Sequence, residues 1–122
     1  MASWEIHLWP DVEAWLLGLE SANYVRVVAA IDFLALEGPS LGRPLVDRVS
    51  GSRHHNLKEL RPSSGKSSAI RILFAFDPKR RAILLVGGDK AGAWEQWYRE
   101  QVPIADSRLD TWLEHRGRQD YE

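Results

Sequence analysis

The first third of the chain begins with the two-residue hydrophobic period of a strand and continues with the ~3.6-residue period of helices. Residues Trp4 to Leu8 alternate apolar and polar side chains, which predicts a short strand. Pro10 suits the first turn of a helix, and apolar residues then recur at helical spacing: Val12, Trp15, Leu16 and Leu19. Ser21 is the expected N-cap of a second helix, which ends at Gly38-Pro39 and whose apolar stripe is Tyr24, Val27, Val28, Ile31 and Leu34. The short connection between the two helices predicts an antiparallel helical hairpin.

The centre of the chain changes to the two-residue period of strands. Leu57 to Arg61 alternates, and the loop Pro62 to Ser68 separates it from a second alternating segment, Ala69 to Phe76. One face of that segment carries Ile70, Ile72, Phe74 and Phe76, and the other carries Arg71, Leu73 and Ala75. After a tight turn at Asp77 to Arg80, Ile83 to Val86 is apolar on both faces, as in a strand inside a sheet. We expect Gly87-Gly88 to end this strand.

Helical spacing returns after Lys90. Trp94, Trp97 and Tyr98 share one helical face, and Pro103 is expected to restart a second helix with Ala105, Leu109, Trp112 and Leu113. The predicted order is β-α-α-(β)-β-β-β-α-α, in which the strand in parentheses is optional. This order indicates one α+β domain over residues 1–122, with helices on one face of a small, mostly antiparallel sheet.

Composition limits the class of protein. The chain has 122 residues, of which 44% are hydrophobic and 27% charged, as in soluble globular proteins. It has no cysteine, which excludes a disulfide framework, a thiol nucleophile and a thiolate zinc site. No segment predicts a signal peptide or a membrane span, so we expect a cytoplasmic protein without membrane contact.

Charge is unevenly distributed along the chain. The formal net charge is -1, but residues 43–90 contain eleven Lys and Arg against four Asp and Glu, a local +7, and the remaining residues sum to −8. A basic centre between acidic flanks can present a positive surface to a polyanion while the whole molecule stays nearly neutral. Scattered solvated charge is the alternative.

Three segments in the basic centre carry a more specific signal. They read Leu-x-Glu-Leu-Arg over 57–61, Arg-Ile-Leu-Phe over 71–74 and Leu-Leu-x-Gly-Gly-x-Lys over 84–90. In this order they resemble the RelE/ParE toxin superfamily, most of all its phage-derived HigB branch. The resemblance implies a RelE-like fold and a metal-independent mRNA endoribonuclease without cofactor, which acts on translating ribosomes. It also implies a HigA-like antitoxin with a helix-turn-helix domain as the partner.

Cleavage of RNA by its own 2′-hydroxyl requires proton transfer and stabilisation of a negatively charged phosphorane. Arg71 is the candidate stabiliser, because a rigid strand directs it away from the Ile/Phe face toward solvent or a cleft. An ion pair with Glu59 on the neighbouring strand is the alternative. Lys90, at the expected strand end, is a second catalytic candidate. Arg61 is expected to hold the substrate or to form a salt bridge that positions its strand.

Candidates for proton transfer are His54 and Tyr98. Histidine titrates near neutrality, although the pair His54-His55 also fits a solvated loop, and adjacent histidines alone do not complete a metal site. Tyr98 lies in an aromatic stripe for which core packing is the alternative. Further RNA-binding candidates are Arg53, Lys58 and Lys66.

The main competing hypothesis is a protein without catalysis. The ParE branch of the same superfamily poisons DNA gyrase by binding, and a catalytically silent domain kept for partner binding is a third reading. The cationic strand residues and the histidine pair favour the nuclease.

Overall fold

The computed structural model describes residues 3–62, 69–90 and 92–119. Its strands are β1 (Glu5–Leu8), β2 (Val46–Arg48), β3 (Lys58–Leu60), β4 (Ile70–Asp77) and β5 (Arg81–Asp89). Its helices are α1 (Pro10–Leu17), α2 (Ser21–Glu37), the 3-10 turn η1 (Gly38–Ser40) and α3 (Trp94–Gln119). No helix among these residues is long and apolar enough to cross a membrane.

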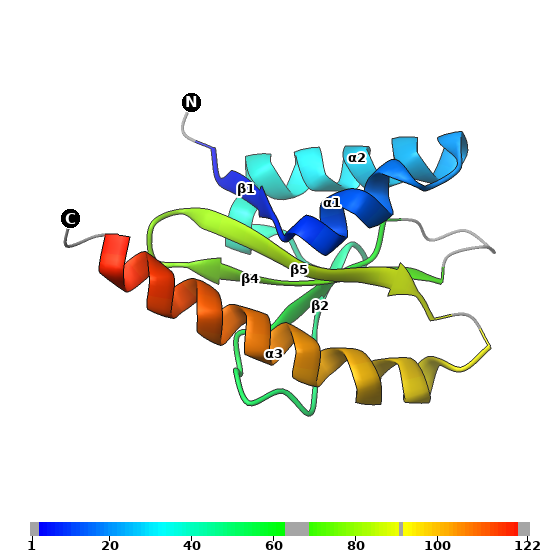
Figure 1. Cartoon of the computed structure of the whole chain (residues 1–122). Coiled ribbons are helices and arrows are strands. Elements are labelled where there is room, and N and C mark those ends of the chain that lie inside the picture. The colour runs from blue at the N-terminus through cyan, green and yellow to red at the C-terminus, as the bar shows by residue number, and fades with distance from the viewer. Residues whose placement is uncertain (1–2, 63–68, 91, 120–122) are drawn as a thin grey trace.

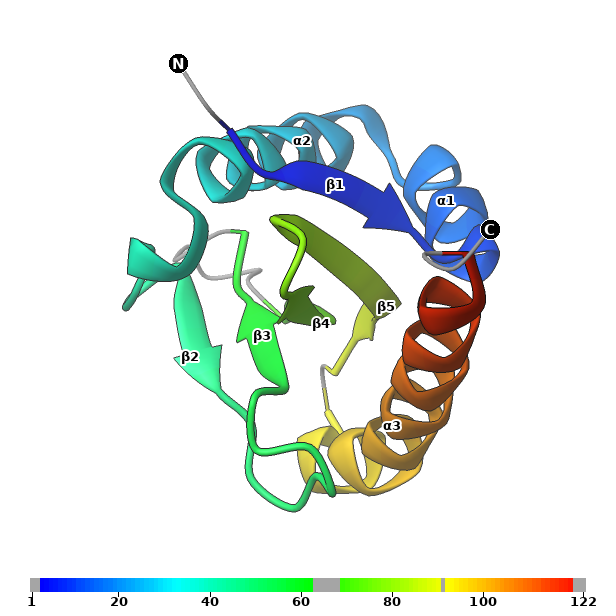
Figure 2. The same ribbon diagram turned by 90° about the vertical axis from the view of Figure 1, so that its left-hand side faces the viewer.

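The five strands form one mixed sheet in the order β1-β5-β4-β3-β2 (Figures 1 and 2). β1 pairs with β5 in parallel, and all other neighbours are antiparallel. The long hairpin β4–β5 forms the centre, and the three-residue strand β2 forms one edge. β2 is the optional strand of the predicted order. The α+β class with a mostly antiparallel sheet is therefore confirmed.

The N-terminal hairpin covers one face of the sheet. Val12 and Leu16 of α1 and Val27 and Leu34 of α2 pack there against strand residues that include Phe74. The predicted stripes are confirmed except at Tyr24, whose side chain is 38% exposed. Ser21 begins α2 as its first residue, and Glu20 holds the N-cap position without a side-chain hydrogen bond.

The opposite face of the sheet is covered by α3 (Figure 2). Leu73 and Ala75 of β4 contact this layer together with Leu85 of β5, whereas their neighbours along β4 face α1 and α2. The prediction that all helices lie on one face is wrong. Two apolar faces on each central strand need a helical layer each, because otherwise one face would be left in water.

Two predicted boundaries are also wrong, for packing reasons. β5 continues through Gly87 and Gly88 to Asp89. A Cβ on Gly87 would lie 2.4 Å from the ring of Trp15, and one on Gly88 would lie 2.8 Å from Nε1 of Trp97. Glycine at both positions therefore leaves room for an indole ring from each helical layer to pack against the strand.

Pro103 lies inside one continuous helix and does not restart it. Proline removes one helical hydrogen bond and disfavours a helix interior. Here Val102, Ala105 and Leu109, on both sides of the proline, are buried against the sheet and hold the helix together.

Candidate functional site

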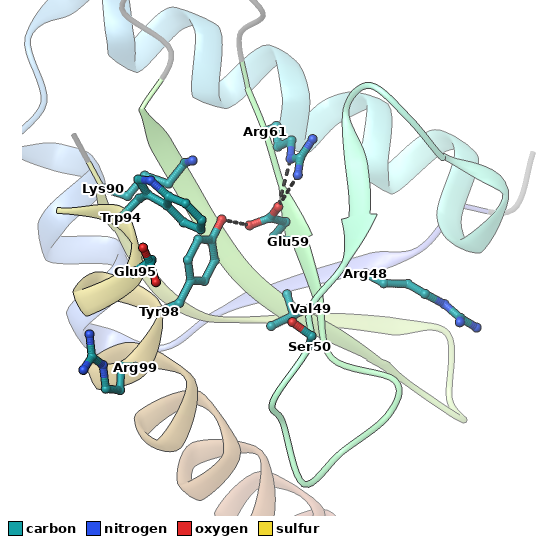
Figure 3. A pocket seen from close by; sticks show the side chains of 10 residues that line it. All are labelled: Arg48, Val49, Ser50, Glu59, Arg61, Lys90, Trp94, Glu95, Tyr98 and Arg99. Atoms are coloured by element: carbon teal, nitrogen blue, oxygen red, sulfur yellow. Dashed lines mark hydrogen bonds and ion pairs between the residues drawn. The ribbon is translucent and has the colours of Figure 1, made fainter. Parts of the chain in front are cut away.

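A pocket of about 500 Å³ opens between the β2–β3 edge and the first turns of α3 (Figure 3). β3 supplies Glu59, with Arg61 directly after it, and Lys90 directly follows β5. Four cations and two carboxylates are in its wall, so the pocket has a formal charge of +2. The full lining is Arg48, Val49, Ser50, Glu59, Arg61, Lys90, Trp94, Glu95, Tyr98 and Arg99.

Glu59 is at the centre of the polar contacts in this pocket. It is only 3% exposed, because β3 lies between β2 and β4 and α3 covers that face. Arg61 donates to Oε2 from Nε at 2.8 Å and lies with Nη2 at 2.7 Å from the same oxygen. The Tyr98 hydroxyl donates a short hydrogen bond to Oε1, and Figure 3 shows Tyr98 and Arg61 on opposite sides of the carboxylate. A buried carboxylate with these donors is held in one orientation.

The environment of Tyr98 favours its protonated form. Burial, followed by the hydrogen bond to the Glu59 carboxylate, raises the pKa of Tyr98 to about 12. Its ring meets Trp97 edge-on at 5.1 Å and Trp94 at 6.4 Å between centroids. The ring of Tyr98 is therefore packed, as the core-packing alternative expects, and its hydroxyl lies at the pocket against Glu59; a role in proton transfer stays a prediction.

Lys90 is placed by the end of β5, where its backbone N–H donates to the Ala69 carbonyl at 2.9 Å. Its ammonium lies 5.5 Å from the Trp94 ring centroid and 5.8 Å from that of Tyr98. Burial lowers the pKa of Lys90 below the usual lysine value, and the charge of Arg71 lowers it further. A lower pKa makes this ammonium a stronger acid than an exposed lysine.

Arg71 is more buried than the sequence predicts. The residue is 9% exposed, and it is not among the residues that line the pocket. Its Nε is 3.9 Å from Glu59 Oε1, and its Nη1 donates to its neighbour's carbonyl, Ile70 O, at 2.8 Å. The expected direction away from the Ile/Phe face is confirmed, but α3 covers that face, and the alternative pairing with Glu59 is observed.

Comparison with known proteins gives the family. The model of the family described as "Phage derived protein Gp49-like" matches residues 14–110. "Putative toxin HigB3" of Mycobacterium tuberculosis is 55% identical over 112 residues, which cover 90% of this chain and 96% of that protein. "Putative toxin HigB2" of the same organism is 59% identical over 95 residues, 78% of this chain and 47% of that protein. The chain belongs to the Gp49-like family of HigB-type proteins.

Solved structures show that this HigB-type chain has a RelE-like fold. RelE in an archaeal RelE-RelB complex from Pyrococcus horikoshii has a TM-score of 0.57 at 20% identity, and the match covers 76% of this chain and all of that one. A mutant of E. coli toxin RelE in the free state has a TM-score of 0.56 at 10% identity, over 75% of this chain and 88% of that one. The predicted RelE superfamily fold is confirmed.

Two of the predicted site residues of this HigB-type chain, Arg53 and His54, are not among the residues that line the pocket. His54 Nε2 is 2.7 Å from Asp110 Oδ1, and Arg53 Nη2 is 2.6 Å from Asp110 Oδ2. Asp110 follows Tyr98 by twelve residues, or about 18 Å along α3 at the α-helical rise. These contacts hold the 52–54 loop against α3, and His55 is exposed.

The remaining candidates divide between the pocket and other places. Arg61, Lys90 and Tyr98 line the pocket together, and Arg71 forms an ion pair with Glu59 of the same pocket. Lys58 points to the other sheet face, 5.5 Å from the Phe76 ring. Lys66 lies outside the described residues.

Sequence reasoning did not assign Glu59 to the site, except as a possible partner of Arg71. It also missed Arg48 and Arg99 in the pocket wall. One signal was available, the carboxylate itself. Glu59 stands mid-strand in a segment with eleven cations and only four carboxylates, and a carboxylate that is merely solvated is unexpected at such a position. Within residues 3–62, 69–90 and 92–119, no three His, Cys, Asp or Glu side chains gather in a way that could hold a metal ion.

Proposed function

We propose that this protein is the toxin of a type II toxin–antitoxin pair and that its pocket cleaves mRNA. The observation that carries the proposal is the buried Glu59 carboxylate held between the Tyr98 hydroxyl and Arg61 in a net positive pocket. A base, an acid and cations within one small cavity are the groups that RNA cleavage by 2′-hydroxyl attack requires. The HigB-type relatives support the same role.

Glu59 is the proposed general base. An RNA 2′-oxygen entering the pocket would displace the Tyr98 hydroxyl from Glu59 and transfer its proton to the carboxylate. The 2′-oxygen then bonds to phosphorus, and the bond from phosphorus to the 5′-oxygen breaks, which yields a 2′,3′-cyclic phosphate and a 5′-hydroxyl. Arg61 and Lys90 are placed to neutralise the extra charge of the phosphorane.

Tyr98 is the proposed general acid. Its raised pKa, about 12, keeps the hydroxyl protonated at neutral pH, so it can give its proton to the leaving 5′-oxygen. Arg71 is a positioning residue, because it lies beside Glu59 without lining the cavity. His54 takes no part in this scheme, because its ring is engaged by Asp110.

The size of the site supports the proposal that cleavage depends on the ribosome. Four cations in a cavity of about 500 Å³ can hold only a few phosphates, and non-specific affinity for RNA grows with the number of phosphates contacted. Such a site gains most from a substrate that is presented in one geometry, as mRNA is in the ribosomal decoding centre. A cytoplasmic location follows from this role.

The experiment that tests the function is a time course of one message with the purified protein, with and without translating ribosomes. Rapid cleavage only with ribosomes is expected. Equal rates in both reactions would refute ribosome dependence. Intact transcripts in both, together with an SOS response on expression in cells, would refute the nuclease and favour the gyrase-directed alternative.

The proposed partner is a HigA-like antitoxin with a helix-turn-helix domain, and the outer face of α2 is its proposed docking surface. Val25, Phe33 and Leu36 are 65%, 52% and 58% exposed there, and such a row of apolar side chains is typical of an interface. Residues 5–37 carry six acidic side chains and one basic, so a partner helix with an apolar face and a basic rim fits this surface better than a second copy of the chain.

A further inference from the structure

The β2–β3 register places two pairs of like charges directly opposite one another. Asp47 faces Glu59, and Arg48 faces Lys58. Opposed residues of an antiparallel pair lie on the same face, with Cβ atoms ~4.5–5.5 Å apart, and like charges in these positions repel. An opposite charge between the members of each pair would remove this repulsion.

The acidic pair finds its counter-charge within the chain. Nη2 of Arg61 lies 2.7 Å from Glu59 Oε2 and 3.3 Å from Asp47 Oδ2, so one guanidinium bridges both carboxylates. Arg43 adds a second cation, with Nε 3.2 Å from Asp47 Oδ2. On this face the repulsion is neutralised in the free protein.

The basic pair has no such bridge. In the part of the chain that the structure describes, no carboxylate forms an ion pair with Arg48 or Lys58. Lys58 contacts the ring of Phe76, and Arg48 is exposed. Both line a second hollow of about 270 Å³ together with Arg43 and Asp47, which pair with each other, so Arg48 and Lys58 leave the hollow with a formal charge of +2. Two facing cations in a concave surface form a site that an anion would complete.

Arg48 connects this hollow with the pocket. It lines both cavities, and Figure 3 shows its side chain directed away from Glu59 and Tyr98. β2 is an edge strand, so an extended ligand can pass across it from one cavity to the other. A polymer with an anion at each residue is the chemistry that fits two cationic hollows on either side of one strand.

We propose that Arg48 and Lys58 bind a second phosphate of the RNA strand whose scissile phosphate lies in the Glu59 pocket. The inference rests on the proposed function and extends it, because it predicts that the bound RNA runs from the Glu59 pocket across the β2 edge to the second hollow. One phosphate offers enough acceptor oxygens for both cations, which would relieve their repulsion. This contact positions RNA and does not read its sequence.

The test is a binding measurement with RNA that cannot be cleaved. A 2′-O-methyl dinucleotide, with one phosphodiester, reaches only the pocket, whereas a 2′-O-methyl octanucleotide also reaches the second hollow. Lys58→Gln is expected to weaken octanucleotide binding about tenfold, which corresponds to one charge-assisted hydrogen bond. The slope of log affinity against log salt should fall by ~0.7. Binding of the dinucleotide should not change.

Arg26→Gln is the matched control, because it removes one exposed cation from α2 and changes the net charge equally. An equal loss in this control, a loss for both RNA lengths with Lys58→Gln, or no loss at all overturns the second phosphate site. Arg61→Gln should weaken both lengths. If it leaves the dinucleotide unaffected, the proposed pocket fails, while the length dependence with Lys58→Gln still decides the second site.

Discussion

Tyr98→Phe removes one oxygen from the pocket and tests the proposed proton donor directly. Glu59 keeps its contacts to Arg61 and its ion pair with Arg71, so the carboxylate loses only the Tyr98 donor. We expect a loss of ~1.5–3 kcal/mol in the free energy of unfolding, since hydrogen bonds to charged groups contribute about this much. For a domain of this size the melting temperature should fall by roughly 5–15 °C.

The effect of Tyr98→Phe on catalysis should be far larger than its effect on stability. Loss of a general acid slows a reaction by about 10²–10⁴-fold. The assay is single-turnover cleavage of ribosome-bound mRNA by folded protein, followed by primer extension to locate the cut. A rate within a few-fold of the parent would refute Tyr98 as the proton donor.

Tyr24→Phe is the control for Tyr98→Phe. It removes the same oxygen from a tyrosine that is 38% exposed on α2. Neither the rate nor the melting temperature should change. A similar loss of rate in this variant would mean that the assay reports a general effect on the protein and not the chemistry of the pocket.

Four further predictions concern other parts of the structure. Because folding raises the pKa of Tyr98 from 10.0 to about 12, its protonated form stabilises the fold below pH 10, and this stability is lost as pH rises from ~10 to ~12. The melting temperature of Tyr98→Phe should therefore fall less with pH over this range than that of the parent, and equal falls would contradict this. Arg48→Gln removes one of two facing cations, so it should raise the free energy of unfolding by ~0.2–1 kcal/mol in denaturant titrations while weakening RNA binding. A destabilised variant would show that Arg48 supports the fold. His54→Ala should keep the cleavage rate of the parent, and a loss beyond tenfold in folded protein would return His54 to the mechanism. Phe33→Asp should abolish binding of the co-expressed antitoxin in a pull-down without changing cleavage, and an intact complex would exclude the outer face of α2 as the docking surface.

Periodicity predicted the parts of the fold that depend on neighbours in sequence. The alternation over Ala69 to Phe76 correctly divided β4 into two faces, and the apolar run of β5 correctly indicated an internal strand. The prediction that all helices lie on one face was nevertheless wrong, because the alternation along a strand does not say which helix covers which face. That choice depends on long-range packing, such as Leu109 of α3 against the Leu73 face.

The candidate site was predictable by residue type and less so by geometry. Arg61, Lys90 and Tyr98 were found because cations and a phenol at strand and helix ends suit phosphate chemistry. The role of Glu59 was missed because it depends on strand register, which brings Asp47 opposite it, and on the depth of burial under α3. The contact of His54 with Asp110 could not be predicted, because the two residues are 56 positions apart in sequence.

The parallel pairing of β1 with β5 bears on how the protein folds during its synthesis. Each paired residue in β1 is synthesised 76 positions before its partner in β5, as Leu8 is before Leu84. At ~5–20 residues per second this delay is about 4–15 s, and α3 with Tyr98 is made later still. The sheet is therefore completed, and Tyr98 joins the pocket, only when most of the chain has been synthesised. If the protein cleaves mRNA on translating ribosomes as proposed, this late assembly protects the ribosome that synthesises it.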